Sequence, residues 1–292
     1  MAAKSQPWYL RVVPSAIKGD ATVIPLVRLN GAIGMGTPLR PALTLASLND
    51  TLERAFAMRK APAVVLAVNS PGGSPVQSAL IHSRIRQLAR DREKRVIAYC
   101  EDVAASGGYW LASAGDEIYA DPSSIIGSIG VLYAGFGFSG LMEKAGVERR
   151  VYTAGEHKMT LDPFQPARDQ DVERLKRMQA DVHDSFKTLV RERRAGKLDG
   201  NEEELFSGAF WSGRQALALG LIDGLGSLHD IVREKFGPDA TVKPVARPGN
   251  WIRRLAVPRV WGRGAREPLA YGFADELVSV LEVRALWQRF GL

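Results

Sequence analysis

Residues 96–110 read Val-Ile-Ala-Tyr-Cys-Glu-Asp-Val-Ala-Ala-Ser-Gly-Gly-Tyr-Trp, and this stretch decides the fold. It opens with an apolar run typical of a buried strand and passes through Ser106 into a segment that we expect to be helical from Tyr109 to Ala114. A serine at such a turn can present its hydroxyl beside the free N–H groups of a helix N-terminus, which suit a developing oxyanion. Taken alone, such a stretch is most often a serine that only caps the helix.

The chain before this stretch alternates strands and helices. Ala63–Val68 is a continuous apolar run, as found in strands of a parallel sheet that is covered on both faces. Amphipathic helices are expected over Leu43–Arg59 and Val76–Arg90, and a strand over Ala21–Leu29, where Pro25 indicates an edge or a bulge. The pattern predicts an α/β fold with a parallel sheet flanked by helices.

Composition changes divide the chain into three parts. We expect an irregular N-terminal arm over residues 1–20, a compact domain over 21–236 and a tail rich in Pro, Arg and Trp over 237–292. The tail ends in a predicted amphipathic helix from Asp275 to Phe290. Its mixture of tryptophan and arginine is typical of segments at a membrane surface, and packing against protein is the alternative.

The charge, the cysteine content and the lack of long apolar runs limit the kinds of partner, site and cellular location that we expect. The formal net charge is +7, without any recognised nucleic-acid motif, so no nucleic-acid partner is expected. Cys100 is the single cysteine, which excludes an intramolecular disulfide and a CxxC metal site, and we expect it to be a small buried residue. Without a secretory signal or an 18-residue apolar run, the sequence predicts a cytoplasmic protein with at most peripheral contact at the inner face of the membrane.

A nucleophilic serine needs a base. His82 and His183 lie in predicted amphipathic helices and are expected on the surface, whereas Lys158 follows a short predicted strand over Glu148–Tyr152. A lysine removed from water can give up its proton near neutral pH and act as a general base, and a Ser–Lys pair is a variant of the serine triad. An ordinary surface lysine is the alternative.

Four motifs occur in a fixed order, and together they resemble the signal peptide peptidase family of bacterial serine peptidases. They are Asn69-Ser-Pro-Gly-Gly73, Ala105-Ser-Gly-Gly-Tyr109, Ala120-Asp-Pro-Ser-Ser-Ile-Ile-Gly-Ser-Ile-Gly-Val131 and Gly155-Glu-His-Lys158. The resemblance covers about Val23 to Val232. It implies a fold of the Clp protease and crotonase type, built from repeated ββα units, to which this chain adds its C-terminal amphipathic extension.

The resemblance also implies roles for particular residues. Ser106 corresponds to the family's nucleophile, Lys158 to its general base, Ser128 to the hydroxyl that orients the lysine, and Gly73 and Gly107 to the oxyanion-hole amides. No metal or cofactor is implied. The expected substrates are peptides with small or apolar side chains, and the expected assembly is a homo-oligomeric ring in which serine and lysine can come from neighbouring protomers.

The chain is expected to depart from the family pattern in two ways, and two other functions are open. Family members that cleave remnant signal peptides usually carry an N-terminal membrane anchor, which we do not expect here, and the tail after Gly237 is additional. One rival is an acyl-CoA enzyme of the crotonase type, which needs the two oxyanion amides but not Ser106 and Lys158 together. The other is a catalytically silent scaffolding homologue, which would more readily have lost one member of the pair.

Overall fold

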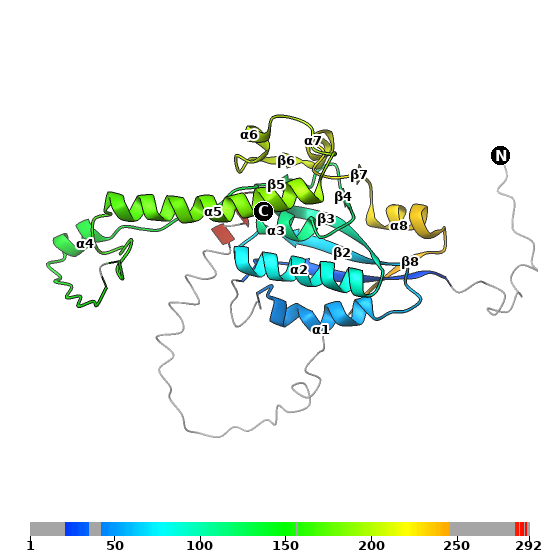
Figure 1. Ribbon diagram of the computed structural model, residues 1–292, viewed down its shortest axis with the longest axis horizontal. Coiled ribbons are helices and arrows are strands. Elements are labelled where there is room, and N and C mark those ends of the chain that lie inside the picture. Colours follow the sequence, from blue (N-terminus) through cyan, green and yellow to red (C-terminus); the bar gives the residue numbers. More distant parts are fainter. Residues whose placement is uncertain are drawn as a thin grey trace, which may run out of the picture.

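One mixed sheet with helices on both faces forms the body of the molecule (Figure 1). The computed structural model describes residues 21–34, 42–155, 157–245, 284–285, 287–288 and 290, so the predicted arm over 1–20 and the tryptophan–arginine segments of the tail lie outside the described residues. The strands are β1 Val23–Asn30, β2 Ala63–Ser70, β3 Arg95–Ala105, β4 Glu117–Ala120, β5 Ile125–Gly127, β6 Phe210–Ser212, β7 Gly224–Leu225 and β8 Thr241–Pro244. The helices are α1 Leu45–Phe56, α2 Pro75–Asp91, α3 Gly107–Ala112, α4 Ser139–Lys144, α5 Asp169–Arg193, α6 Glu202–Leu205, α7 Gly213–Ala218 and α8 Leu228–Phe236.

The predicted α/β class is confirmed, with one correction to the parallel sheet. The strand order is β6-β5-β3-β2-β1-β8, and β4 pairs with both β3 and β7 beside this path. Every pairing between named strands is parallel except the antiparallel contact of β5 with β6. The sheet is therefore mixed, because β6 returns beside β5 after the long excursion of α5.

The two central strands are as apolar in the structure as the sequence predicts. Every residue of β2 is buried, as expected for a strand that is covered on both faces. One face packs against the inner sides of α1, α2, α3 and the C-terminal half of α5, while residues such as Val65 and Ile97 face Val232 of α8. Cys100 is fully buried, as predicted, and burial raises the pKa of its thiol to about 12.

The sheet differs from expectation at its β1 side. Pro25 predicted an edge or a bulge, but β1 lies between β2 and β8, so this prediction is wrong. Pro25 pairs with Lys243 of β8, while the pairing with β2 begins one residue later at Leu26. The sheet thus extends to Pro244, past residue 236, where the sequence places the end of the compact domain.

Strand β3 changes partner halfway along. Its first half, Ile97–Cys100, pairs with β4, and its second half, Val103–Ala105, pairs with β5. Between the pairs Val68↔Cys100 and Ser70↔Ala104, β2 advances two residues and β3 four, so β3 carries a bulge of two extra residues. A bulge bends a strand and re-aims the residues that follow it, here those that lead to Ser106.

The segment between β5 and α5 forms a projecting arm, residues 131–168, with α4 at its far end beyond the end of α5 (Figure 1). The sequence predicts a strand over Glu148–Tyr152, but these residues are irregular, so that prediction is wrong. Helix α4 has no buried residue, and only Asp171, Phe186 and Val190 of the long α5 are buried. The arm therefore has little of the chain's own core to pack against.

Candidate active site

Ser106 stands at the junction of β3 and α3 in a strained backbone conformation. Its φ of 53° and ψ of −121° lie outside the common regions for a residue with a Cβ. It occupies the N-cap position of α3, yet its side chain makes no capping hydrogen bond. Its N–H donates to the carbonyl of Gly127 at 2.7 Å. The hydroxyl is thus free of the structural task that the capping interpretation would give it.

Two glycines allow the β2–α2 loop to touch this turn. A Cβ on Gly72 would come within 2.8 Å of the Ser106 Cβ and 3.0 Å of the Gly107 nitrogen. A Cβ on Gly107 would lie 2.5 Å from the Ser78 Oγ. Real Cβ atoms do not approach so closely, so the two loops can meet only because both positions lack side chains. The β2–α2 loop therefore lies beside Ser106.

The two predicted oxyanion amides are both available. Ile33 donates to the carbonyl of Gly72 at 2.9 Å and accepts from the N–H of Ser74 at 2.8 Å, in a parallel bridge. In such a bridge the intervening residue, here Gly73, points its own N–H away from the partner strand. Gly107 is the first residue of α3, whose N–H has no intrahelical acceptor. Neither amide donates to another described residue.

Ser128 lies beside Ser106 because of the strand register. Ala105, the last residue of β3, pairs with Gly127, the last residue of β5. Ser106 and Ser128 directly follow this pair, so they start from neighbouring positions at the end of the sheet. Ser128 is buried, has a φ of 53° like Ser106, and donates its N–H to the carbonyl of Ala209 at 2.6 Å. Its hydroxyl makes no hydrogen bond with another described residue.

Of the five predicted site residues, Lys158 is the one that lies apart from the other four within the single chain. It lies in a turn of the projecting arm, and its side chain is exposed. Its N–H donates to the carbonyl of Gly155 at 3.2 Å, but its amine makes no hydrogen bond or ion pair with another described residue. Four of the five predicted residues thus gather at one place, and the fifth lies on the arm.

Two residues that hold this region, Asn69 and His183, were not predicted from the sequence to do so. Asn69 bridges the bulge, donating from Nδ2 to Asp102 Oδ2 at 2.6 Å and accepting at Oδ1 from the N–H of Val103 at 3.3 Å. The Nε2 of His183 lies 3.1 Å from the carbonyl of Ile129, the residue after Ser128. Only the position of Asn69 at the end of an apolar run could have signalled its role.

Neither His82 nor His183 lies fully on the surface, contrary to the sequence-based expectation. His183 is half-buried, and His82 is buried between α2 and the C-terminal end of α5. Burial, with a contribution from the nearby Arg193 guanidinium, lowers the pKa of His82 to about 4. An amphipathic pattern does not record that α2 packs against both α1 and α3.

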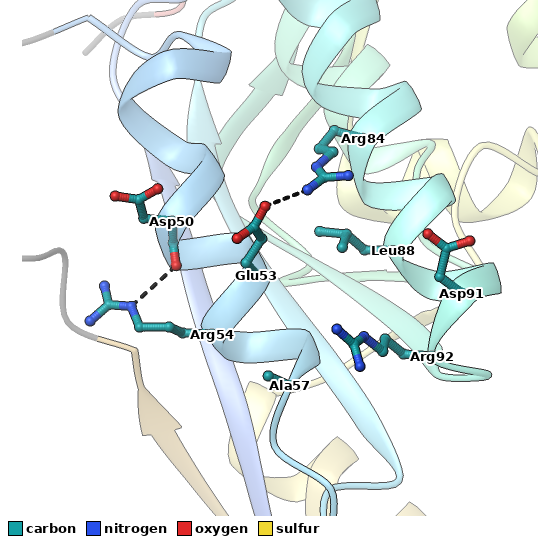
Figure 2. Close-up of a pocket in the computed structure, with 8 residues that line it drawn as sticks. All are labelled: Asp50, Glu53, Arg54, Ala57, Arg84, Leu88, Asp91 and Arg92. Carbon is teal, nitrogen blue, oxygen red and sulfur yellow. Dashed lines mark hydrogen bonds and ion pairs between the residues drawn. The ribbon is translucent and has the colours of Figure 1, made fainter.

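One pocket of the described residues lies away from this constellation. It is a groove of about 740 Å³ between α1 and α2, lined by Asp50, Glu53, Arg54, Ala57, Arg84, Leu88, Asp91 and Arg92 (Figure 2). Arg84 crosses it to bind Glu53 at 2.5 Å. None of the five predicted site residues lines it, and its charges of both signs neutralise one another. Elsewhere in the described residues, no helix is long and apolar enough to cross a membrane, and no metal-binding cluster occurs.

Comparisons with known proteins point to one family. The model of peptidase family S49 matches residues 88–241, which include Ser106, Ser128 and Lys158. The chain is 30% identical over 222 residues to "Serine protease SPPA, chloroplastic" of Arabidopsis thaliana, an alignment that covers 74% of this chain and 32% of that protein. It is 52% identical over 286 residues to proteins of Brucella abortus and Brucella melitensis that are named "Na(+)/H(+) antiporter NhaA". Those alignments cover 97% of this chain but 39% of each Brucella protein.

Proposed function

This chain belongs to peptidase family S49, and from that premise we propose that it is a serine endopeptidase in which Ser106 is the nucleophile and Lys158 the general base. The single observation that carries the proposal is the turn at Ser106. There a strained serine with an uncommitted hydroxyl stands at the start of α3, in close approach to Gly72 of the β2–α2 loop. An N-cap serine would use its hydroxyl for the helix, and Ser106 does not.

Each group has a defined chemical task in this mechanism. The neutral amine of Lys158 accepts the proton of the Ser106 hydroxyl as Oγ attacks the scissile carbonyl carbon. The N–H groups of Gly73 and Gly107 stabilise the oxyanion that forms. Lys158 then donates the proton to the leaving amine. Water attacks the carbonyl carbon of the acyl-enzyme as Lys158 takes a proton from it, and Lys158 returns this proton to the Ser106 Oγ as the ester bond breaks and the acid product leaves. Ser128, next to Ser106, accepts or donates a hydrogen bond that holds the amine without adding charge.

We infer that Lys158 reaches Ser106 from a second copy of the chain, as in a homo-oligomeric ring. The arm that carries Lys158 exposes large apolar side chains, with Phe136 82% and Tyr152 91% exposed. A soluble single chain rarely exposes such a concentration of aromatic surface, which is typical of an interface. Other exposed apolar residues of the arm are Leu132, Tyr133, Phe138, Leu141, Val147 and Phe164.

The rival functions make different demands on the site. An acyl-CoA enzyme of the crotonase type would use the two amides but leave the Ser106 hydroxyl without a role, and a silent scaffold would need neither. The positive φ shared by Ser106 and Ser128 supports the peptidase, since strain of this kind persists where a function depends on it.

Covalent labelling tests the proposal. A fluorophosphonate probe, which reacts with activated serines, is expected to modify Ser106, as located by mass spectrometry of the digested protein. The variants Ser106→Ala and Lys158→Ala are each expected to lose at least about 10³-fold in kcat/KM on unstructured peptides. Ser123→Ala, an exposed serine on the loop before β5, is the matched control and keeps wild-type turnover. Near-normal turnover by Ser106→Ala or Lys158→Ala would refute the dyad.

A further inference from the structure

Asp162 is the only buried residue among the described residues of the projecting arm, 131–155 and 157–168. Its side chain is 2% exposed, although it ends in a carboxylate. Burial of an unpaired charge is costly, so a buried carboxylate needs a cation and hydrogen-bond donors around it. The arm therefore holds a carboxylate at the kind of place where a larger unit has an apolar core.

Arg149 is the cation that pairs with this carboxylate. Its Nη1 donates to both carboxylate oxygens of Asp162, and its guanidinium lies over the Phe164 ring, 4.8 Å from the centroid. The N–H of Phe164 donates to Asp162 Oδ1 at 3.1 Å. Chiefly through the Arg149 hydrogen bonds, the pKa of the Asp162 carboxyl lies below its ordinary value, so the pair is ionised at neutral pH. We call Arg149, Asp162 and Phe164 the arm clamp.

The arm clamp adjoins the turn that carries Lys158. Asp162 lies four residues after Lys158 in the chain. Between them, Thr160 Oγ1 donates to the carbonyl of His157 at 2.8 Å, which closes the turn around Lys158. Leu161 follows with a φ of 54°, a left-handed conformation that residues with a Cβ rarely adopt. The turn is thus joined to Asp162 through a single strained residue, and such strain persists only where the surrounding contacts hold it.

Placement of this turn decides where the Lys158 amine can go. A lysine ends in a point charge on a flexible four-carbon stem, so its amine is placed only as well as the backbone that carries it. The amine itself makes no hydrogen bond or ion pair with another described residue. A displacement of about 1 Å in a reacting group can lower a rate by about 10²-fold.

We propose that the arm clamp positions the general base: the ion pair of Arg149 with Asp162 fixes the turn from which Lys158 reaches Ser106. This inference rests on the proposed peptidase function. Arg149 and Asp162 are positioning residues, because in the proposed mechanism they act through the Lys158 turn and not on the reacting atoms. Loss of the pair leaves the peptide-binding surface of the sheet intact and misplaces the amine, so it slows proton transfer without weakening peptide binding.

Steady-state kinetics of clamp variants test the proposal. Asp162→Asn keeps the shape of the side chain but removes its charge, and it is expected to lower kcat on an unstructured peptide by about 10- to 100-fold at unchanged KM. Arg149→Met is expected to do the same, and Arg149→Lys, which restores the charge without the planar guanidinium, is expected to recover part of kcat. Glu148→Gln is the matched control and keeps wild-type kcat, because Glu148 pairs with Arg150 on the same arm but both side chains are exposed, at 71% and 69%. Wild-type kcat in Asp162→Asn and Arg149→Met, or a loss seen only in KM, would overturn the proposal.

Amine labelling reports on the turn without any need for turnover. Ser106→Ala forms no acyl-enzyme, and in this background limiting acetic anhydride labels lysine amines, which mass spectrometry of the digested protein then quantifies. Lys144 at the end of α4 is exposed on the same arm and is the internal reference. Adding Asp162→Asn is expected to raise the labelling of Lys158 relative to Lys144 by about three- to tenfold, because the released amine leaves its seat in the assembly. An equal rise at both lysines would mean that the pair only folds or docks the arm, and would overturn the positioning role.

The two measurements together separate this inference from the proposed function. A selective rise at Lys158 in a protein whose wild type hydrolyses no peptide would support the clamp and refute the peptidase. Unchanged labelling of Lys158 and unchanged kcat in Asp162→Asn, in a protein whose wild type does hydrolyse peptides, would refute the clamp and leave the peptidase standing.

Discussion

Ser106 and Ser128 are neighbours with the same unusual backbone angle, a φ of 53°. Such a conformation costs of order 1–3 kcal/mol for a residue with a Cβ. Each residue donates one short backbone hydrogen bond, from Ser106 to Gly127 and from Ser128 to Ala209. The two serines directly follow the paired residues Ala105 and Gly127, at the end of adjacent strands. A structural role alone does not explain why serine, and not glycine, stands at both positions.

His82 gives the molecule an acid-sensitive group far from this pair. Burial is the main cause that lowers its pKa from 6.5 to about 4, and the positive charge of Arg193 adds to it. In the unfolded chain His82 takes up a proton below about pH 6.5, whereas in the folded chain it stays neutral down to about pH 4. The unfolded state therefore binds more protons in this window. The free energy of unfolding is expected to fall from pH 6.5 to pH 4, by up to about 3 kcal/mol from this group.

Urea unfolding at a series of pH values measures this contribution. His82→Gln removes the titration while keeping a polar side chain of similar length, so its free energy of unfolding is expected to fall less steeply between pH 6.5 and pH 4. His229→Gln is the control, because His229 is exposed on α8 and its replacement leaves the wild-type slope. Parallel pH profiles for the wild type and His82→Gln would contradict the assignment.

At the scale of elements, the bulge in β3 decides where Ser106 lies. The bulge replaces ladder hydrogen bonds between β2 and β3, and the side chain of Asn69 supplies the lost contacts from both of its ends. The side-chain amide of Asn69 therefore supplies the hydrogen bonds between β2 and β3 that backbone groups supply in a regular ladder. The two strands end side by side at the loops that carry Gly73 and Ser106.

A swap of the bridging pair tests that role. Asn69→Asp puts two carboxylates where a 2.6 Å hydrogen bond now joins Asn69 to Asp102, and it is expected to lower kcat/KM by about tenfold or more through displacement of the turn. Asp102→Asn leaves an amide that can still accept a hydrogen bond and is expected to cost little. The double variant exchanges the partners and is expected to recover most of the lost activity, with a coupling energy of about 1–3 kcal/mol. A double variant as impaired as Asn69→Asp would show that the pair does not hold the turn.

The elements that the sequence predicted well are those fixed by local pattern. The apolar runs of β2 and β3 and the helical periods of α1 and α2 need no knowledge of distant residues. The cap of α2 is equally local, because the Ser74 hydroxyl accepts from the N–H of Gln77 within the same turn. The failures depend on partners elsewhere in the chain: a strand over Glu148–Tyr152 had no neighbour to pair with, and β1 gained β8 at its outer side.

In the candidate site, too, the features that depend on neighbouring residues could be predicted, and those that depend on distant residues could not. The turn at Ser106 could be predicted from residues 96–110, because a strand, a small-residue turn and a helix follow directly in the chain. The bulge that aims it, and the bridge through Asn69, come from a register shift between two strands that no local pattern records. The burial of Phe290 against Ala105 joins residues 185 positions apart and was equally beyond the sequence.

At the scale of the whole molecule, the fold separates the proposed nucleophile, Ser106, from the proposed base, Lys158. The body of the sheet carries Ser106, Ser128 and the two amides, whereas the arm carries Lys158 on a segment that buries almost nothing of its own. Within the arm, the Phe136, Phe138 and Phe164 rings lie against one another, and Arg149 lies over Phe164 and binds Asp162. The arm thus has internal order but lacks a surface to dock on, which a second copy of the chain would supply.

Mixing two inactive variants tests whether the site is completed between chains. Ser106→Ala retains the lysine and Lys158→Ala retains the serine, so a mixed assembly contains some sites in which an intact serine meets an intact lysine. With equal amounts and random assembly, each site draws the right serine chain half of the time and the right lysine chain half of the time. Peptide hydrolysis is therefore expected at about a quarter of the wild-type rate after co-expression. Native mass spectrometry of the co-expressed protein verifies that mixed assemblies have formed. If mixed assemblies form and remain inactive, the serine and the lysine must act within one chain, and the arm must then fold back onto its own sheet.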